Sequence, residues 1–233
     1  MKVYEYGDPA ASTVLVQMAD DHDLAVLENE AALIRELSGK DFRLIAVKVN
    51  DWNHDLSPWK APAVFGNESF GDGAESTLSE VLKLLADIDK PHLPGDGRMD
   101  LTGNSKKDLP GAKRTYYIGG YSLAGLFALW AVYQTDLFAG AAAASPSIWF
   151  PGFLDYMKEH EIKTRSIYLS LGDREEKTRN PVMAQVGSCI RSAHALLEDR
   201  GVRCTLEWNK GNHFKDPDLR TAKAFTWVMD GKS

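Results

Sequence analysis

Along the chain, short runs of branched and aromatic apolar residues alternate with longer segments whose apolar residues recur at helical spacing. The short runs predict strands at residues 3–6, 13–18, 42–49, 114–119, 138–144, 166–171 and 203–208. The helical periodicity, which includes Leu37 in its first segment, predicts helices over 24–37, 78–88, 126–133, 153–160, 182–199 and 219–229. This alternation predicts a mainly parallel sheet with right-handed crossovers and flanking helices.

Two segments rich in Pro and Gly interrupt the alternation, at residues 53–76 and 91–111. The pattern of strands and helices resumes directly after each segment, so we interpret both as surface connections rather than domain linkers. A chain of 233 residues is long enough to bury roughly 70% of its unfolded surface in one core. The sequence therefore predicts a single α/β domain over residues 1–233.

The charge of the chain limits its partners. The formal net charge is −6 at pH 7, so no overall positive field favours nucleic acid or anionic lipid. The two cysteines form no CxxC pair, which argues against a zinc ribbon or a disulfide framework. The first nine residues lack a signal-peptide pattern, and no apolar run is long enough to span a bilayer. We expect a cytoplasmic protein, and no feature indicates its oligomeric state.

A strand that runs into a glycine-rich turn and then an apolar helix is the strongest chemical signal in the sequence. The strand ends in Gly119-Gly-Tyr-Ser-Leu-Ala-Gly125, the context of a nucleophile elbow with Ser122 at its tip. Small residues are needed at Gly120 and Ala124 because strand and helix pass closely there. Ala124 stands where the second glycine of this motif is usual. The string alone is equally typical of a tight turn, so its meaning depends on a base and an acid.

The base and the acid are expected on later loops, since the ligand-binding edge of a parallel sheet is formed where its strands end. His213, in the loop before the last helix, is the candidate base that would activate the Ser122 hydroxyl. A carboxylate of the segment 172–176 could orient the imidazole and stabilise its charged form. The chain order of serine, acid and histidine is that of α/β hydrolases.

These motifs resemble those of esterases of the α/β-hydrolase superfamily, related to the esterase D and enterochelin esterase groups. The resemblance rests on GYSLAGLFALW at 120–130, SPSIW at 145–149, LGDREE at 171–176 and GNHF at 211–214. It implies an α/β-hydrolase fold with Ser122 as nucleophile and His213 as base. Because related esterases commonly place the acid three residues after the strand-ending glycine, it favours Glu175, with Asp173 and Glu176 as alternatives.

Hydrolysis through a tetrahedral intermediate also needs two hydrogen-bond donors for its oxyanion. The Leu123 amide, directly after the nucleophile, is the first candidate. The second should come from the loop after strand 13–18, which makes the amides of Asp20 and Asp21 candidates. The acidic residues of this loop precede a helix, where they complement the helix dipole. We predict neither a metal nor a cofactor.

Aromatic residues near the expected site are candidates for substrate binding. They are Tyr121, beside the nucleophile, and Trp52 and Trp59 on the long loop, where both tryptophans could equally anchor the loop. Basic residues that flank the acid and histidine loops could bind an anionic group or form a solvated rim, and they are Arg174, Lys177, Arg179, Lys210 and Lys215.

The expected function is that of a serine hydrolase that cleaves a small carboxylic ester through an acyl-enzyme. An acyltransferase or a peptidase would use the same three side chains, so the sequence does not separate them from an esterase. A hydrolase fold that binds a ligand without catalysis is a further alternative from a different class.

Overall fold

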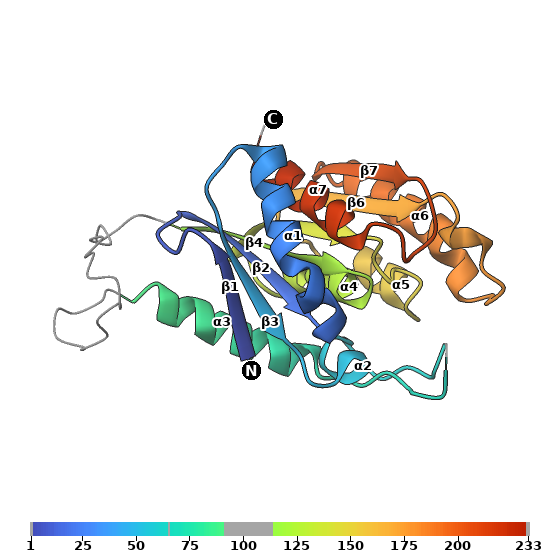
Figure 1. The fold of residues 1–233 in the computed structure, drawn as a ribbon. Helices are drawn as coiled ribbons and strands as arrows, with labels where there is room; N and C mark the ends of the chain where they lie inside the picture. Colours follow the sequence, from blue (N-terminus) through green and yellow to red (C-terminus); the bar gives the residue numbers. More distant parts are fainter. Residues whose placement is uncertain (1, 65, 91–113, 232–233) are drawn as a thin grey trace.

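A computed structural model describes residues 2–64, 66–90 and 114–231 (Figure 1). Its strands are β1 (Lys2–Gly7), β2 (Thr13–Ala19), β3 (Arg43–Lys48), β4 (Thr115–Tyr121), β5 (Phe138–Ala144), β6 (Ser166–Gly172) and β7 (Arg203–Asn209). Its α-helices are α1 (Asp21–Ser38), α2 (Trp52–Asp55), α3 (Ala74–Ile88), α4 (Leu123–Gln134), α5 (Phe153–Glu159), α6 (Val186–Asp199) and α7 (Pro217–Met229). Two 3₁₀ turns, η1 (Glu175–Lys177) and η2 (Met183–Gln185), lie between β6 and α6.

The seven strands form one sheet in the order β1-β3-β2-β4-β5-β6-β7. All neighbouring pairs are parallel except β1 with β3, which places the one antiparallel strand at an edge. The register pairs Gln17 of β2 with Gly119 of β4, and Tyr121 of β4 with Ala144 of β5. The carboxyl ends of β2, β4 and β5 therefore lie side by side, and the loops that follow them share one edge of the sheet.

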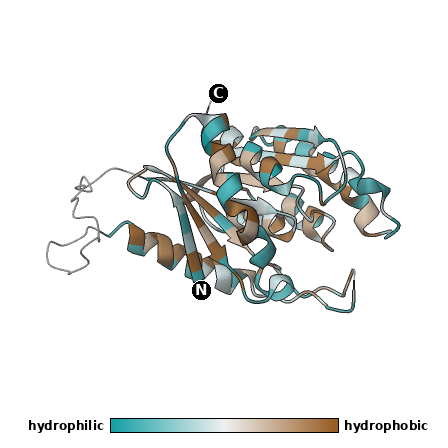
Figure 2. Ribbon diagram, in the orientation of Figure 1, coloured by the Kyte–Doolittle hydropathy of each residue, from teal (hydrophilic) through white to brown (hydrophobic). Residues whose placement is uncertain are grey.

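Helices cover both faces of the sheet (Figure 1). Helices α1 and α7 pack together on one face, and α3, α4, α5 and α6 contribute to the core on the other. Strand β2 shows the alternation that this requires, because Val14, Val16 and Met18 join one core cluster while Leu15 and Ala19 join the other. Apolar residues accordingly concentrate in the strands and in the buried helix α4 (Figure 2).

The predicted α/β class and its mainly parallel sheet are confirmed, with local differences. The irregular segment 53–76 overlaps the short helix α2 and the start of α3. Leu37, expected on the apolar stripe of its helix, is 46% exposed because it lies in the last turn of α1. The other surface connection, 91–111, lies outside the described residues. No helix in the described parts of the chain has the length and apolarity that crossing a bilayer requires.

Candidate active site

Ser122 occupies a strained turn between β4, which ends at Tyr121, and α4, which begins at Leu123. Its backbone has φ 57° and ψ −120°, a conformation that a residue with a side chain rarely adopts. Gly120 has φ 156°, and a Cβ there would lie 2.6 Å from the Cβ of Ala124. A side chain at position 120 would therefore require Ala124 or the backbone to shift. The turn holds the Ser122 hydroxyl at the carboxyl end of β4.

Ser122, His213 and Glu175 form one hydrogen-bonded chain. The Ser122 Oγ lies 3.0 Å from His213 Nε2, and His213 Nδ1 lies 2.6 Å from Glu175 Oε2. Three loops supply these side chains, after β4, β6 and β7, which are brought together by the parallel sheet. The Glu175 side chain is only 4% exposed, whereas that of His213 is 27% exposed. The imidazole therefore contacts a buried carboxylate, while part of the His213 side chain stays open to solvent.

The other two acid candidates point elsewhere. Asp173 accepts a hydrogen bond from the backbone amide of Gly211 at 2.8 Å. Glu176 pairs with Arg191 of α6 at 2.9 Å. Of the three carboxylates in this loop, Glu175 is therefore the one that contacts His213.

The second oxygen of Glu175 is fully engaged by donors. Glu175 Oε1 accepts from the Gly172 amide at 2.7 Å, from Ser145 Oγ at 2.9 Å and from Arg220 Nη1 at 3.0 Å. These donors come from the end of β6, the loop after β5 and α7. Hydrogen bonds to the charged form stabilise a buried carboxylate, which would otherwise be costly to bury.

Arg220 was not identified from the sequence, although it connects most parts of the site. It is 2% exposed and lies on α7 one helical turn before the buried Ala224 and two turns before Val228. An arginine at a position of the apolar face is the signal that could have identified it, because buried arginines are rare unless paired.

Ser147 supplies a further hydroxyl beside Ser122. Its Oγ lies 3.3 Å from the Oγ of Ser122, and its amide donates to the Ser122 carbonyl at 3.0 Å. The segment after β5 is thus fixed against the turn of Ser122 by backbone and side-chain contacts. Ser145 of the same segment has φ 42° and is completely buried, which directs its hydroxyl to Glu175.

The candidate oxyanion donors lie at two helix starts, where the first amides have no partner within the helix. Leu123 is the first residue of α4 and Asp21 the first residue of α1. The Asp20 amide, in contrast, donates to the carboxylate of Asp23 at 3.2 Å. The Asp20 amide is therefore already occupied by a partner within the protein.

The acidic segment before α1 forms a helix cap. The Asp20 side chain accepts from the amides of His22 and Asp23, and Asp23 accepts in turn from the Asp20 amide. Burial, followed by the nearby Asp20 carboxylate, raises the pKa of Asp23 to about 6. Among the described residues, no group of three or more His, Cys, Asp or Glu side chains is arranged to hold a metal ion.

The aromatic candidates for substrate binding are mostly occupied by contacts within the protein. The Tyr121 hydroxyl donates to the His213 carbonyl at 2.7 Å and accepts from Arg220 at 3.0 Å, and Tyr121 is only 8% exposed. Tyr121 therefore holds the histidine loop through the hydrogen bond to the His213 carbonyl. Trp59 donates from its indole to the Pro151 carbonyl at 2.9 Å, a contact typical of a loop anchor. Trp52 and Trp59 both pack against the core cluster on the face of the sheet that is covered by α4.

Phe214 was not among the sequence candidates, although it is the most exposed large apolar residue of the described chain. It is 86% exposed, and its ring packs edge-on against that of His213 with the centroids 5.6 Å apart. A large exposed aromatic ring directly after the histidine is a surface that a substrate can cover.

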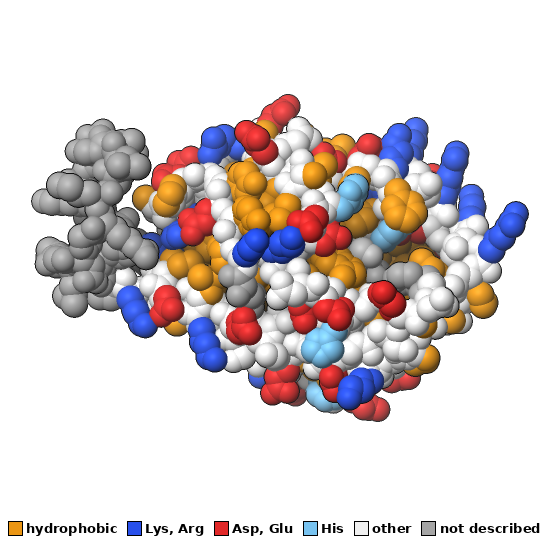
Figure 3. Space-filling model, turned by 60° about the horizontal axis from the view of Figure 1, so that its bottom comes forward, with side chains coloured by type: hydrophobic (Ala, Val, Ile, Leu, Met, Phe, Trp, Pro, Cys, Tyr) orange, Lys and Arg blue, Asp and Glu red, His pale blue; other side chains and the backbone are white. Residues whose placement is uncertain are grey.

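The basic residues of the acid and histidine loops are exposed. Lys and Arg side chains gather at the end of the molecule where the loops after β6 and β7 lie (Figure 3). Lys215 approaches Asp216 at 3.9 Å. No ion pair within the described chain joins a carboxylate to the remaining four, which are Arg174, Lys177, Arg179 and Lys210.

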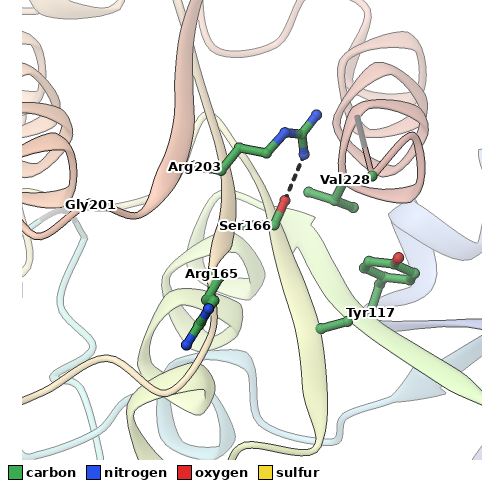
Figure 4. A pocket seen from close by; sticks show the side chains of 8 residues that line it. Tyr117, Arg165, Ser166, Gly201, Arg203 and Val228 are labelled. Carbon is green, nitrogen blue, oxygen red and sulfur yellow. Dashed lines mark hydrogen bonds between the residues drawn. The ribbon is translucent and has the colours of Figure 1, made fainter. Parts of the chain in front are cut away.

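A hollow of about 490 Å³ lies near the amino ends of β4, β5, β6 and β7 (Figure 4), at the end of the strands opposite to Ser122. Arg203 donates to Ser166 Oγ at 2.9 Å on one side of it, and Tyr117 and Val228 lie on the other (Figure 4). Because Ser122 follows the carboxyl end of β4, this hollow is separate from the hydrogen-bonded chain of Ser122, His213 and Glu175.

Proteins similar to this chain are found by comparing its structure with solved structures, and not by comparing its sequence. No protein-family model and no curated sequence matches the chain. An IroE-like serine hydrolase from Shewanella oneidensis has a TM-score of 0.71 at 14% identity, with 98% of this chain and 74% of that chain covered. The siderophore hydrolase EstA from Aspergillus nidulans has a TM-score of 0.65 at 18% identity, with 94% and 82% covered.

A third similar structure is the enterobactin esterase FES from Shigella flexneri, with a TM-score of 0.60 at 16% identity. The match covers 97% of this chain and 54% of that longer chain. The shared architecture confirms at the level of the fold the resemblance found in the sequence motifs. The chain thus has the α/β-hydrolase fold of these esterases.

Proposed function

We propose that this protein is a serine hydrolase that cleaves a small carboxylic ester through an acyl-enzyme. The observation that carries the proposal is the continuous hydrogen-bonded chain from Ser122 Oγ through His213 to Glu175, at 3.0 and 2.6 Å. A serine hydroxyl is a weak nucleophile alone, and a histidine within hydrogen-bond reach, oriented by a carboxylate, is what activates it.

In the acylation step, Ser122 Oγ attacks the ester carbonyl carbon while His213 Nε2 accepts the hydroxyl proton. Glu175 holds the imidazole in the tautomer with the proton on Nδ1 and stabilises the imidazolium that forms. The carbonyl oxygen becomes an oxyanion, for which the amides of Leu123 and Asp21 are the proposed donors. The tetrahedral intermediate then collapses, the bond to the alcohol oxygen breaks, and His213 gives its proton to the departing alcohol.

Water completes the reaction. It attacks the acyl carbon as His213 Nε2 accepts one of its protons, and a second tetrahedral intermediate forms. Its collapse breaks the bond to Ser122 Oγ, which recovers the proton from His213, and the carboxylic acid is released. The His213 side chain is 27% exposed, so part of it is already open to solvent.

Two alternatives use the same site. Acyl transfer or peptide cleavage shares the acyl-enzyme, and competition between water and added alcohols or amines as acceptors distinguishes transfer from hydrolysis. A binding protein without catalysis would gain thermal stability from a ligand but would not react with a serine-directed probe. Two solved structures that share the fold are named a siderophore hydrolase and an enterobactin esterase, which favours hydrolysis of an ester among these alternatives.

The direct test is the turnover of p-nitrophenyl acetate by Ser122→Ala. We expect kcat/KM to fall by at least about 1000-fold, because the covalent intermediate can no longer form. Ser145→Ala does not serve as a control, since Ser145 contacts Glu175. Ser188→Ala is suitable, because Ser188 is an exposed residue on α6 whose hydroxyl donates to the Gln185 carbonyl. Undiminished turnover by Ser122→Ala would contradict the proposal.

A further inference from the structure

Arg220 lies at the centre of the polar network beneath the site. Its Nη1 atom donates to Glu175 Oε1 at 3.0 Å, to the Tyr121 hydroxyl at 3.0 Å and to Ser145 Oγ at 3.2 Å. Its Nη2 atom donates to the carbonyls of Lys210 at 3.3 Å and Asn212 at 3.1 Å. One side chain therefore contacts the acid, the nucleophile strand, the segment after β5 and the histidine loop.

Burial makes this arrangement energetically demanding. The side chains of Arg220 and Glu175 are 2% and 4% exposed, so both charges are removed from water. Such a pair is tolerated only where each partner compensates the other and the remaining donors and acceptors are satisfied. A role in stability alone would be met as well by apolar residues of similar volume. The network instead links Arg220 to the parts of the chain that carry the proposed chemistry.

We propose that Arg220 is a positioning residue for Ser122, His213 and Glu175. This inference rests on the proposed hydrolase function. Arg220 fixes the Glu175 carboxylate so that Oε2 faces the imidazole, and it fixes the two carbonyls at Lys210 and Asn212 that precede His213. Its charge also offsets that of Glu175, which limits how strongly the carboxylate stabilises the imidazolium.

The second effect predicts a change in pH dependence when the charge is removed. With Glu175 uncompensated, the imidazolium of His213 becomes more stable, and the base becomes active only at higher pH. The other groups around the pair leave this argument intact. Burial raises the pKa of Tyr121 to about 12, so its hydroxyl stays neutral, and Ser145 and the Gly172 amide are neutral as well. On the exposed loop, Lys215 and Asp216 carry opposite charges 3.9 Å apart.

Two substitutions separate the charge from the geometry. Arg220→Met removes the charge and keeps most of the side-chain volume, whereas Arg220→Lys keeps a charge beside Glu175 but loses the planar fork. The matched control is Arg203→Met. Arg203 also packs against α7, where it lies 3.7 Å above the Trp227 ring. It donates to Ser166 Oγ of β6, and it has no bond to Ser122, His213 or Glu175.

The experiment measures kcat, KM and the pH profile of kcat/KM with p-nitrophenyl acetate, at a temperature where circular dichroism shows each variant folded. For Arg220→Met we expect kcat to fall about 10- to 100-fold, KM to change less than about 3-fold, and the acid-side midpoint to rise by about 0.5 to 1 pH unit. For Arg220→Lys we expect a smaller fall in kcat and an unchanged midpoint. For Arg203→Met we expect a lower melting temperature with kcat and midpoint unchanged.

A folded Arg220→Met variant with unchanged kcat and midpoint would overturn the inference. If that variant is unfolded, Arg220→Lys decides, because a wild-type kcat in the folded lysine variant would exclude a role for the guanidinium fork. Failure of the proposed hydrolase function would give a different result. Ser122→Ala would then retain turnover, whatever the behaviour of the Arg220 variants.

Discussion

His213 Nδ1 lies 2.6 Å from Glu175 Oε2, and no other carboxylate of the acid loop contacts the imidazole. A charged hydrogen bond of this kind fixes the tautomer in which Nε2 is free to accept a proton. For Glu175→Gln we therefore expect kcat for p-nitrophenyl acetate to fall by about 1000- to 10,000-fold, since the amide cannot stabilise the imidazolium in the same way.

The two neighbouring carboxylates provide matched controls for this prediction. Asp173 bonds a backbone amide and Glu176 pairs with Arg191, so neither is placed to orient His213. Asp173→Asn and Glu176→Gln should keep kcat within about 3-fold of the wild type. A large loss in either variant, with Glu175→Gln still active, would transfer the role of the acid to that residue.

Gly120 and Ala124 form a steric pair at the turn that carries Ser122. A Cβ at position 120 would lie 2.6 Å from the Ala124 Cβ, and the φ of 156° disfavours a side chain in any case. Gly120→Ala should lower the free energy of unfolding by about 2–4 kcal/mol. Adding Ala124→Gly removes the opposing methyl group and should restore part of that loss. Urea denaturation measures both variants, and a double variant no more stable than Gly120→Ala would show that this contact is not the cause.

The raised pKa of Asp23 makes the stability of the protein depend on pH. The folded state holds the proton up to about pH 6, whereas the unfolded chain releases it near 3.8. Folding is therefore increasingly opposed as pH rises between these values, and the penalty is complete above the upper one. Asp23→Asn removes the charge and keeps an acceptor for the Asp20 amide.

We expect this substitution to raise the free energy of unfolding by about 1–3 kcal/mol at pH 7.5 and by much less at pH 4.5. Urea denaturation at the two pH values measures the difference. Glu28→Gln, at an exposed position of the same helix, is the control and should have little effect at either pH. An equal gain at both pH values for Asp23→Asn would contradict the assignment of the penalty to ionisation.

Phe214 should contribute to substrate binding rather than to folding. Its ring is 86% exposed, so the folded protein gains little from it, but a substrate that covers it gains apolar burial. Phe214→Ala should raise KM for p-nitrophenyl butyrate about 3- to 10-fold, with an unchanged melting temperature and kcat within about 3-fold. Leu137→Ala, an exposed apolar residue just before β5, is the control. An unchanged KM for Phe214→Ala would show that the substrate does not reach this ring.

Much of the fold follows from local patterns in the sequence. The seven strands and the six longer helices are predicted by periodicity and branched apolar runs, although the edge strands β1 and β7 contain no fully buried residue. The order of the strands is not local information. Sequence pattern alone gives no account of why β3 rather than β1 lies beside β2, because this depends on which edges pair after the helices have packed.

The site shows the same division. The strand, turn and helix around Ser122 carry their own signal, and so does the loop of His213, because each lies at the end of a predicted strand. The choice among three nearby carboxylates depends on the η1 turn, which directs Glu175 inward and Glu176 outward. Arg220 on α7 and Glu30 on α1 are ionisable residues at buried helix positions, and a search for apolar periodicity does not identify such residues.

We propose that Ser122 is the nucleophile, and labelling by a fluorophosphonate probe, followed by intact-mass measurement and peptide mapping, tests this directly. We predict one probe per protein, attached to Ser122, with no labelling of Ser122→Ala and slower labelling of His213→Ala. Stoichiometric labelling of Ser122→Ala, or an unlabelled wild-type protein under conditions that label a known serine esterase, would contradict the claim.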